Sequence, residues 1–225
     1  MKPKSKRLNM HAHTYMWVHK RSTLDRNQKG YAMAKLRIAV IISSTRDTRF
    51  GPVAAEWIAG IAREREELDI EVVDLRDYDL PFFNEKMTNR ILPSEDPRAI
   101  AWQKKIGDFD GYIVAMAEYN RSLTGAMKNA FDQAYLEWNR KPIGFVGYGS
   151  VGGAFAIQNA RVIAVELQMV PVRAAVHIGG GEYVKVVHQR QPMTEIEPAI
   201  LPSANDLLDE ITWWGHATKA ARSEG

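Results

Sequence analysis

The sequence predicts a doubly wound α/β domain, in which helices cover both faces of one parallel sheet. Five short apolar runs rich in β-branched residues have the composition of strands buried on both faces; they are residues 36–42, 70–75, 112–116, 142–146 and 170–178. Stretches with helical periodicity separate these runs, and this alternation is typical of a parallel sheet. Polar or glycine-rich loops follow the first, third and fourth runs, at the strand ends where ligands bind in such sheets.

The 225 residues divide into a basic N-terminal stretch and a globular remainder. Residues 1–35 hold nine of the 30 Lys and Arg residues but only one of the 27 acids, so the remainder is acidic. We expect residues 1–34 to be a disordered, dispensable extension and residues 35–225 to form one domain. A basic arm can instead bind nucleic acid or another anionic surface, but the acidic remainder argues against a dedicated nucleic-acid-binding protein.

The composition excludes several kinds of chemistry. The chain has no cysteine, which rules out disulfides, thiolate nucleophiles and Cys-ligated metal clusters. His11, His13 and His19 lie in the basic extension without a rigid scaffold, so no metal site is expected. No apolar run approaches the ~18 residues of a membrane span, and the N-terminus lacks the apolar core of a signal peptide. We therefore expect a soluble, cytoplasmic protein.

The loop after the first strand is a candidate phosphate-binding loop. It contains several hydroxyl groups and two arginines, and it leads into a helix predicted from residue 53 to about residue 67. Free amides, the helix dipole and a guanidinium all favour an anion there. The candidate ligands are Ser44, Thr45, Arg46, Arg49, Phe50 and Gly51. The loop lacks a Walker lysine, so it is not a nucleoside triphosphate loop; an ordinary solvated loop with two exposed arginines is the alternative.

A loop interrupted by prolines follows the second strand. Prolines break regular structure between residues 82 and 95. This loop carries three apolar side chains: Phe82, Phe83 and Met87. They either reach over a binding site or across to a second subunit, or they only anchor the loop to the domain. Asp96 and Pro97 then mark a helix start, with aspartate as the cap and proline in the first turn. A helix is therefore predicted between this loop and the third strand.

The third strand ends in a polar loop with the side chains to contact a flat polar ligand. Tyr119 presents a ring, while Asn120 and Ser122 supply hydrogen-bond donors and acceptors. The candidate binding residues of this loop are Ala117, Glu118, Tyr119, Asn120 and Ser122. Residues 125–138 have helical composition and complete a strand, loop and helix.

The loop after the fourth strand spells G-x-G-x-x-G ahead of a helix predicted over residues 154–167. This is the dinucleotide-binding pattern, but it belongs in the first unit of a Rossmann domain, and the next strand ends at His177 without an acid for a ribose. The loop is also one glycine short of the G-x-S-x-G nucleophile elbow, and no downstream histidine has a clear acid partner. We interpret it as a backbone-lined loop that covers one edge of a flat ligand. Its candidate residues are Gly147, Tyr148, Gly149 and Gly152.

The C-terminal part contains one further predicted helix. Residues 182–202 show little periodicity and contain three prolines, so we expect them to be irregular. Residues 203–219 follow a serine cap and place four apolar side chains on one face: Leu207, Leu208, Ile211 and Trp214. We expect this helix to pack on the sheet.

Four segments carry a family resemblance. Residues 117–132, AEYNRSLTGAMKNAFD, resemble the E-Y-N-x-S-x-P-G-x-L-K-N-A-x-D segment of the NADPH-dependent FMN reductase family, which are flavodoxin-like flavoproteins. Residues 43–49 resemble the family's G-S-x-R-x-x-[SR] loop, and residues 74–81 resemble its D-L-x-x-x-x-L-P connection. Residues 146–153 resemble its V-S-Y-G-x-x-x-G-G loop. The resemblance covers roughly residues 36–180.

The resemblance implies a flavodoxin-like fold with strand order 2-1-3-4-5 and FMN as the cofactor. Ser44, Arg46 and Arg49 would then bind the phosphate, while the loops after the third and fourth strands would hold the isoalloxazine ring. The resemblance further implies an NADPH-dependent oxidoreductase. Hydride passes from NADPH to flavin N5, and the electrons pass to a second acceptor such as a free flavin, a quinone or an azo compound.

Several positions depart from the family pattern. Ser43 stands where glycine is usual, Ala117 and Thr124 stand where prolines are usual, and Gly147 replaces a serine. From Ala117 and Thr124 we expect a looser loop at the flavin edge and altered redox behaviour. Two other functions stay open: a flavodoxin-like electron carrier or flavin-dependent sensor, and a relative that has lost its flavin.

The resemblance also implies a homodimer or a dimer of dimers. On a helix over residues 125–138, four large apolar side chains share one face: Met127, Phe131, Tyr135 and Trp138. Three alanines form a small face that suits close packing on the sheet: Ala126, Ala130 and Ala134. This arrangement would leave the large face for a second copy of the chain. The alternative is that the large face packs on the sheet and the alanines face solvent.

Overall fold

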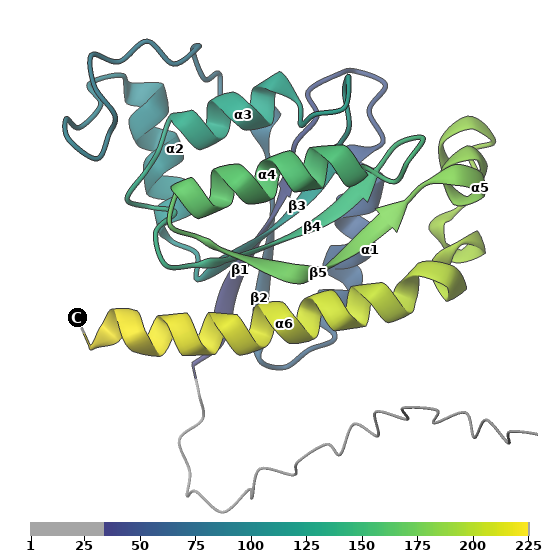
Figure 1. Ribbon diagram of the computed structural model, residues 1–225. Coiled ribbons are helices and arrows are strands. Elements are labelled where there is room, and N and C mark those ends of the chain that lie inside the picture. Colours follow the sequence, from purple (N-terminus) through teal and green to yellow (C-terminus); the bar gives the residue numbers. More distant parts are fainter. Residues whose placement is uncertain (1–33, 225) are drawn as a thin grey trace, which may run out of the picture. The chain divides into compact units, whose positions relative to one another are not determined.

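The computed structural model describes residues 34–224, which contain one five-stranded parallel sheet (Figure 1). The strand order is β2-β1-β3-β4-β5, which confirms the predicted doubly wound, flavodoxin-like topology. The strands are β1 Leu36–Ile42, β2 Leu68–Asp74, β3 Gly111–Ala117, β4 Pro142–Tyr148 and β5 Val170–Ile178. Residues 1–33, nearly all of the expected extension, lie outside the described residues, so that assignment stays a prediction.

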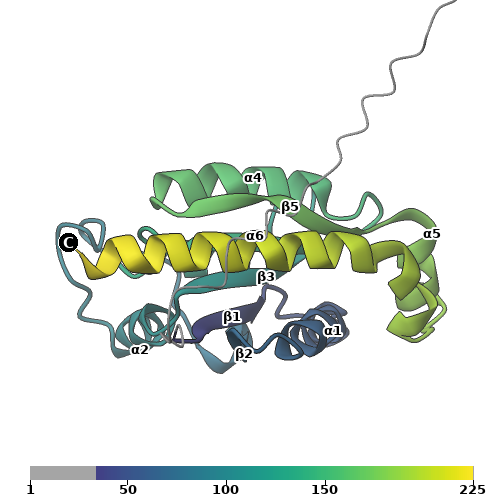
Figure 2. The ribbon, with the colours of Figure 1, turned by 90° about the horizontal axis from the view of Figure 1, so that it is seen from below.

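Helices cover both faces of the sheet. α1 Gly51–Arg63 and α6 Glu197–Ser223 pack on one face. The opposite face carries α2 Pro97–Gly107, α3 Gly125–Asp132 and α4 Ala154–Glu166. Figure 2 shows the long α6 crossing in front of the sheet. A short helix, α5 Gly180–Tyr183, follows β5 and leads through two further turns to α6.

The three central strands are apolar because helices cover both of their faces. Every residue of β3 and β4 is buried, and in β1 only Arg37 is partly exposed. The predicted helix start at Asp96 is present, and its carboxylate accepts a hydrogen bond of 2.8 Å from the main chain of Arg98. Because parallel strands end at one edge of the sheet, the loops after β1, β3 and β4 lie together there.

The dimer surface predicted on α3 is wrong, because this helix is shorter than the sequence pattern suggests. α3 ends at Asp132, and the following turns return Trp138 to the core, where its ring lies 5.4 Å from that of Phe131. The predicted face of Met127, Phe131, Tyr135 and Trp138 requires a helix that continues to residue 138. The alternative is right that the large face packs inward, but two of the three alanines are buried as well instead of facing solvent: Met127, Phe131 and Trp138 on the large face, and Ala130 and Ala134.

The last helix starts earlier than the sequence predicts. α6 begins at Glu197 instead of Ser203 and includes Pro202. Burial of Ile200 and Ala204 against the sheet stabilises these first turns despite the proline. Residues 182–202 are therefore more regular than expected. Among residues 34–224, no helix has the length and apolar character needed to cross a membrane.

Candidate functional site

The loop after β1 presents main-chain donors at the N-terminus of α1. Within the described residues, no main-chain N–H group of residues 44–48, 50 or 51 donates to a protein acceptor, while Asp47 and Thr48 form a hydrogen-bonded turn. No side chain caps α1, and Pro52 occupies its first turn. Ser44 is buried at the base of the loop, whereas Thr45 and Arg46 are exposed. Free amides around an uncapped helix N-terminus form a site for an anion such as phosphate.

The two arginines of this loop are engaged differently. The guanidinium of Arg46 lies 5.0 Å from the ring centroid of Tyr119. Arg49 instead donates to both carboxylate oxygens of Asp74 and, at 2.9 Å, to the main-chain oxygen of Ser44. Burial acts to raise the pKa of Asp74, but the hydrogen bonds from Arg49 and from the main chain of Arg76 outweigh it, so this pKa is lowered. Arg49 thus fixes the loop to the end of β2, whereas the Arg46 side chain stays exposed.

Two residues that depart from the family pattern join the loop after β1 to β3 and α3. The Ser43 hydroxyl accepts a hydrogen bond of 3.1 Å from the main-chain N–H of Ala117. The Thr124 hydroxyl donates to the main-chain oxygen of Ser43 at 2.6 Å. The same hydroxyl accepts from the main chain of Met127 and so caps α3. These contacts tighten the edge of the site, where the sequence alone suggested a looser loop.

The loop after β3 is a tight turn anchored to α4. Tyr119 and Ser122 exchange main-chain hydrogen bonds of 2.9 and 3.0 Å. Between them, Asn120 and Arg121 have φ angles of 50° and 63°, in the left-handed region that asparagine tolerates. The Glu118 carboxylate accepts hydrogen bonds of 3.0 and 3.3 Å from the first turn of α4, at the main chains of residues 155 and 156. Glu118 therefore caps α4 and holds the turn in place.

Glycines allow the loop after β4 to fold back on its own strand. Gly152 and Gly153 have φ angles of 67° and 69°. A Cβ on Gly147 would lie 2.6 Å from the main-chain oxygen of Gly152, so no side chain fits there. That oxygen also makes a hydrogen bond of 2.9 Å with Nδ1 of His177. Close packing and positive φ angles therefore explain why glycines occur at these positions. The G-x-G-x-x-G pattern needs no bound dinucleotide to explain it.

Three hydroxyl groups gather beside the N-terminus of α1. The hydroxyl oxygens of Ser44 and Tyr119 are hydrogen-bonded, 2.6 Å apart. Tyr148, at the end of β4, lies beside Phe50, and their rings pack edge-on with centroids 5.2 Å apart. Sequence analysis predicted that both tyrosines line a flat ring. In the structure, both direct their hydroxyl groups toward the loop after β1.

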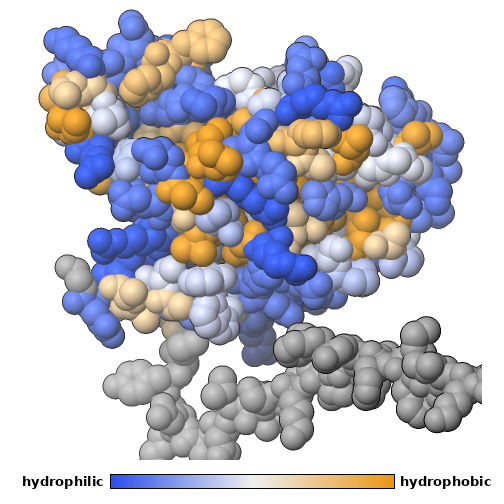
Figure 3. Space-filling model, viewed as in Figure 1, coloured by the Kyte–Doolittle hydropathy of each residue, from blue (hydrophilic) through white to orange (hydrophobic). Residues whose placement is uncertain are grey.

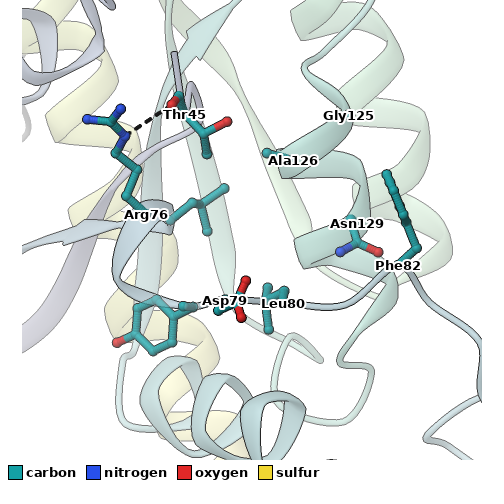
Figure 4. A pocket seen from close by; sticks show the side chains of 10 residues that line it. Thr45, Arg76, Asp79, Leu80, Phe82, Gly125, Ala126 and Asn129 are labelled. Carbon is teal, nitrogen blue, oxygen red and sulfur yellow. Dashed lines mark hydrogen bonds between the residues drawn. The ribbon is translucent and has the colours of Figure 1, made fainter. Parts of the chain in front are cut away.

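A pocket with a volume of about 480 Å³ adjoins this loop (Figure 4). Thr45 and Arg76 form one side of it, and Ala126, Asn129 and Phe82 form the other. The amide of Asn129 holds this second side, because it donates to the Pro81 oxygen at 2.8 Å and accepts from the main chain of Phe83 at 2.9 Å. The loop after β2 is thus anchored to α3 and also lines the pocket.

The structure brings five predicted residues together at the N-terminus of α1: Ser44, Arg46, Gly51, Tyr119 and Tyr148. Other predicted residues support the loops: Arg49 through Asp74, Glu118 through α4, and Ser122 through a hydrogen bond of 3.2 Å from Asn159. Sequence analysis missed Asp74 and Asn159. It also treated the replacements at positions 43, 117 and 124 as separate changes. That all three depart from the family pattern together could have indicated that these residues contact one another, as they do in the structure.

Comparison with known proteins identifies the family. The family described as NADPH-dependent FMN reductase matches residues 36–182. An NAD(P)H-dependent FMN reductase of Schizosaccharomyces pombe is 33% identical over 137 residues, which cover 59% of this chain and 68% of that protein. A 2-hydroxy-1,4-benzoquinone reductase of a Burkholderia species is 31% identical over 143 residues, covering 60% and 73% of the two chains.

The solved structures support the fold. The flavoenzyme NAD(P)H:(acceptor) oxidoreductase FerB of Paracoccus denitrificans superimposes with a TM-score of 0.61 at 19% identity. The match covers 78% of this chain and 97% of FerB. At this identity the similarity establishes the arrangement of the sheet and helices, while the family match rests on the sequence. The chain therefore belongs to the NADPH-dependent FMN reductase family and is an oxidoreductase.

Proposed function

We propose that this chain binds the phosphate of FMN at the N-terminus of α1 and reduces a quinone or flavin at the expense of NADPH. FMN as cofactor and NAD(P)H as electron donor follow from the family. The observation that carries the phosphate site is the set of free main-chain donors at residues 44–48, 50 and 51. Together with the Arg46 guanidinium and the dipole of α1, they supply the charge and hydrogen bonds that a phosphate monoester needs.

When bound, FMN supplies the hydride chemistry at its N5 atom. The residues of the protein bind the cofactor and orient it. Ser44, Thr45 and Arg46 would contact the phosphate, while Arg49 acts through Asp74 to hold their loop. The ring would lie along the main chains of the two loops after β3 and β4, which are kept rigid by Glu118 and by the glycines at residues 147–153. No side chain in this arrangement is required as an acid or base.

We assign the second substrate to the pocket beside Thr45. Its walls combine Leu75, Leu80 and Phe82 with polar groups such as Asn129, and a mixed lining of this kind suits a flat, uncharged acceptor with oxygen atoms, such as a quinone. The Burkholderia relative is named as a benzoquinone reductase, which supports this class of acceptor. Arg76 at the rim is paired with Asp47 and donates to the Thr45 oxygen, so the rim adds little net charge.

We further propose a homodimer, now through α4 instead of α3. Figure 3 shows apolar surface over this side of the domain. Phe155, Val162 and Val165 of α4 are exposed, and a second pocket of about 500 Å³ separates α4 from the start of α3. Apolar side chains gathered on one helix are the usual sign of a contact surface. A dimer built there would lie next to the loop after β3.

The proposed reductase activity is tested by measuring the oxidation of NADPH by FMN-loaded protein in the presence of benzoquinone. Ala126→Leu fills the pocket, so the KM for benzoquinone should rise several-fold while the FMN dissociation constant stays unchanged. Ala101→Leu, at an exposed position on α2, is the matched control. Absence of NADPH oxidation by the wild type would refute the reductase. An unchanged KM in Ala126→Leu would refute only the acceptor site.

A further inference from the structure

The Tyr148 hydroxyl is buried and makes no well-aligned hydrogen bond among the described residues, although the Ser44 hydroxyl lies close enough to interact with it. Tyr148 as a whole is only 5% exposed. A buried hydroxyl without a partner costs free energy, so natural structures seldom retain one unless something else satisfies it. The group therefore points to a ligand.

The direction of this hydroxyl is set by its surroundings. The ring is held edge-on by Phe50, the residue immediately before α1. A Cβ placed on Gly51, the first residue of α1, would lie 3.0 Å from the Tyr148 hydroxyl oxygen. The side chain thus extends from the end of β4 across the top of the sheet to the N-terminus of α1. Glycine at position 51 leaves the room that the hydroxyl occupies.

The surroundings also favour an anion as the partner. The Ser44 and Tyr119 hydroxyls lie in the same cluster, and the Arg46 guanidinium stacks on Tyr119. The same loop after β1 carries the free main-chain donors at the N-terminus of α1. Burial raises the pKa of Tyr148, so its hydroxyl keeps its proton and acts as a donor at neutral pH. The hydroxyls, the guanidinium and the free amides can all donate to a ligand group that is rich in oxygens.

We propose that the Tyr148 hydroxyl donates a hydrogen bond to the phosphate of FMN at the N-terminus of α1. This inference rests on the proposed function and refines it, because it moves Tyr148 from the ring of the flavin to its phosphate. The phosphate is then held from two sides, by the loop after β1 and by a residue that β4 delivers across β3. The hydroxyl would then favour FMN over riboflavin, because riboflavin has no phosphate to accept the hydrogen bond.

The test compares Tyr148→Phe with the wild type for FMN and riboflavin, using quenching of flavin fluorescence. The lost hydrogen bond to a charged phosphate should weaken FMN binding about 10-fold or more, while riboflavin binding stays unchanged. Tyr135→Phe removes a hydroxyl on the far side of α3 and should leave both constants unchanged. Equal weakening of FMN and riboflavin in Tyr148→Phe would place the residue at the ring and overturn the inference alone. A wild type that binds neither flavin would overturn the proposed function as well.

Two further measurements identify the source of the phosphate and the role of the hydroxyl. The ratio of the KM values for NADPH and NADH should be the same in Tyr148→Phe and in the wild type. A change in the KM for NADPH alone would show that the hydroxyl binds the extra phosphate of NADPH, and would overturn the inference. Without flavin, Tyr148→Phe should melt close to the wild-type temperature, because the lost hydroxyl makes no well-aligned hydrogen bond to the protein. With FMN bound, it should melt below the wild type. A variant that is already destabilised without flavin would show a structural role and contradict the proposal.

Discussion

The hydroxyl of Ser43 accepts a hydrogen bond from the main-chain N–H of Ala117 at 3.1 Å, which couples two departures from the family sequence. The family usually has proline at position 117, and proline has no N–H. With alanine there, a buried donor must be satisfied. Serine at position 43, where glycine is usual, supplies the acceptor. The two replacements compensate each other.

This coupling predicts a non-additive double mutant. Ser43→Gly leaves the Ala117 N–H without its acceptor and should destabilise the protein by about 1–3 kcal/mol. The double variant Ser43→Gly/Ala117→Pro removes the donor as well and should recover most of that loss. Urea unfolding of the wild type, both single variants and the double variant measures the coupling free energy. Additive effects would show that the contact between the two residues does not contribute.

Arg46 should contribute strongly to FMN affinity. Its guanidinium is exposed above Tyr119, and a charge-assisted bond to phosphate is worth ~1.5–3 kcal/mol, which corresponds to a loss of roughly 10-fold to 100-fold in Arg46→Ala. Arg46→Lys should recover only part of this, because an ammonium lacks the bidentate fork. Fluorescence titration gives the dissociation constants. Arg63→Ala, at the other end of α1, is the control, and equal constants in all four proteins would remove Arg46 from the site.

Lys141 should make stability depend on pH in the alkaline range. Its ammonium is buried and donates to the main-chain oxygens of Ile106 and Gly107 and to the Tyr112 hydroxyl. Burial first, and the charge of Arg222 second, lower the pKa of Lys141 from 10.5 to about 8. Between these two values the unfolded chain binds more protons than the folded one. Stability should therefore rise with pH across this window, by up to roughly 3 kcal/mol at about 1.4 kcal/mol per pKa unit.

Comparison with Lys141→Met isolates this effect. From pH 8 to pH 10.5, the unfolding free energy of the wild type should rise relative to that of Lys141→Met. Burial raises the pKa of Tyr112, which opposes the trend above pH 10, but Tyr112 is present in both proteins and its contribution largely cancels. Lys104→Met, at an exposed position, should show no such change. Parallel pH profiles for wild type and Lys141→Met would contradict the lowered pKa.

Val162 should lie in the dimer interface on α4. It is 73% exposed in the single chain, and a charge placed in an apolar contact without a partner is costly. Val162→Glu should shift the protein from dimer to monomer in light scattering at micromolar concentration. Val53→Glu carries the same change on α1, on the other face of the sheet, and should leave the dimer intact. A monomeric wild type would rule out the dimer.

The sequence by itself determined the fold and the place of the site. Runs such as residues 36–42 are apolar throughout because helices cover both faces of a central parallel strand, so composition alone locates them. The loops that follow three of these runs must meet at one edge of the sheet, whatever their side chains do. This is why the loops after β1 and β3 could be placed side by side before any contact was known. The cap at Asp96 was equally visible, since it depends on neighbouring residues only.

The tertiary structure alone decided which side chains face a ligand and which surface is free. Arg46 and Arg49 are alike in sequence, but Asp74 at the end of another strand engages only Arg49. Tyr148 adjoins the glycines of its loop in sequence, yet its hydroxyl reaches α1 because Gly51 leaves room for it. The apolar pattern of residues 125–138 predicted a free face, but Trp138 packs against Phe131 because α3 ends early. Each of these outcomes depends on groups that are distant in sequence, whose positions no local pattern encodes.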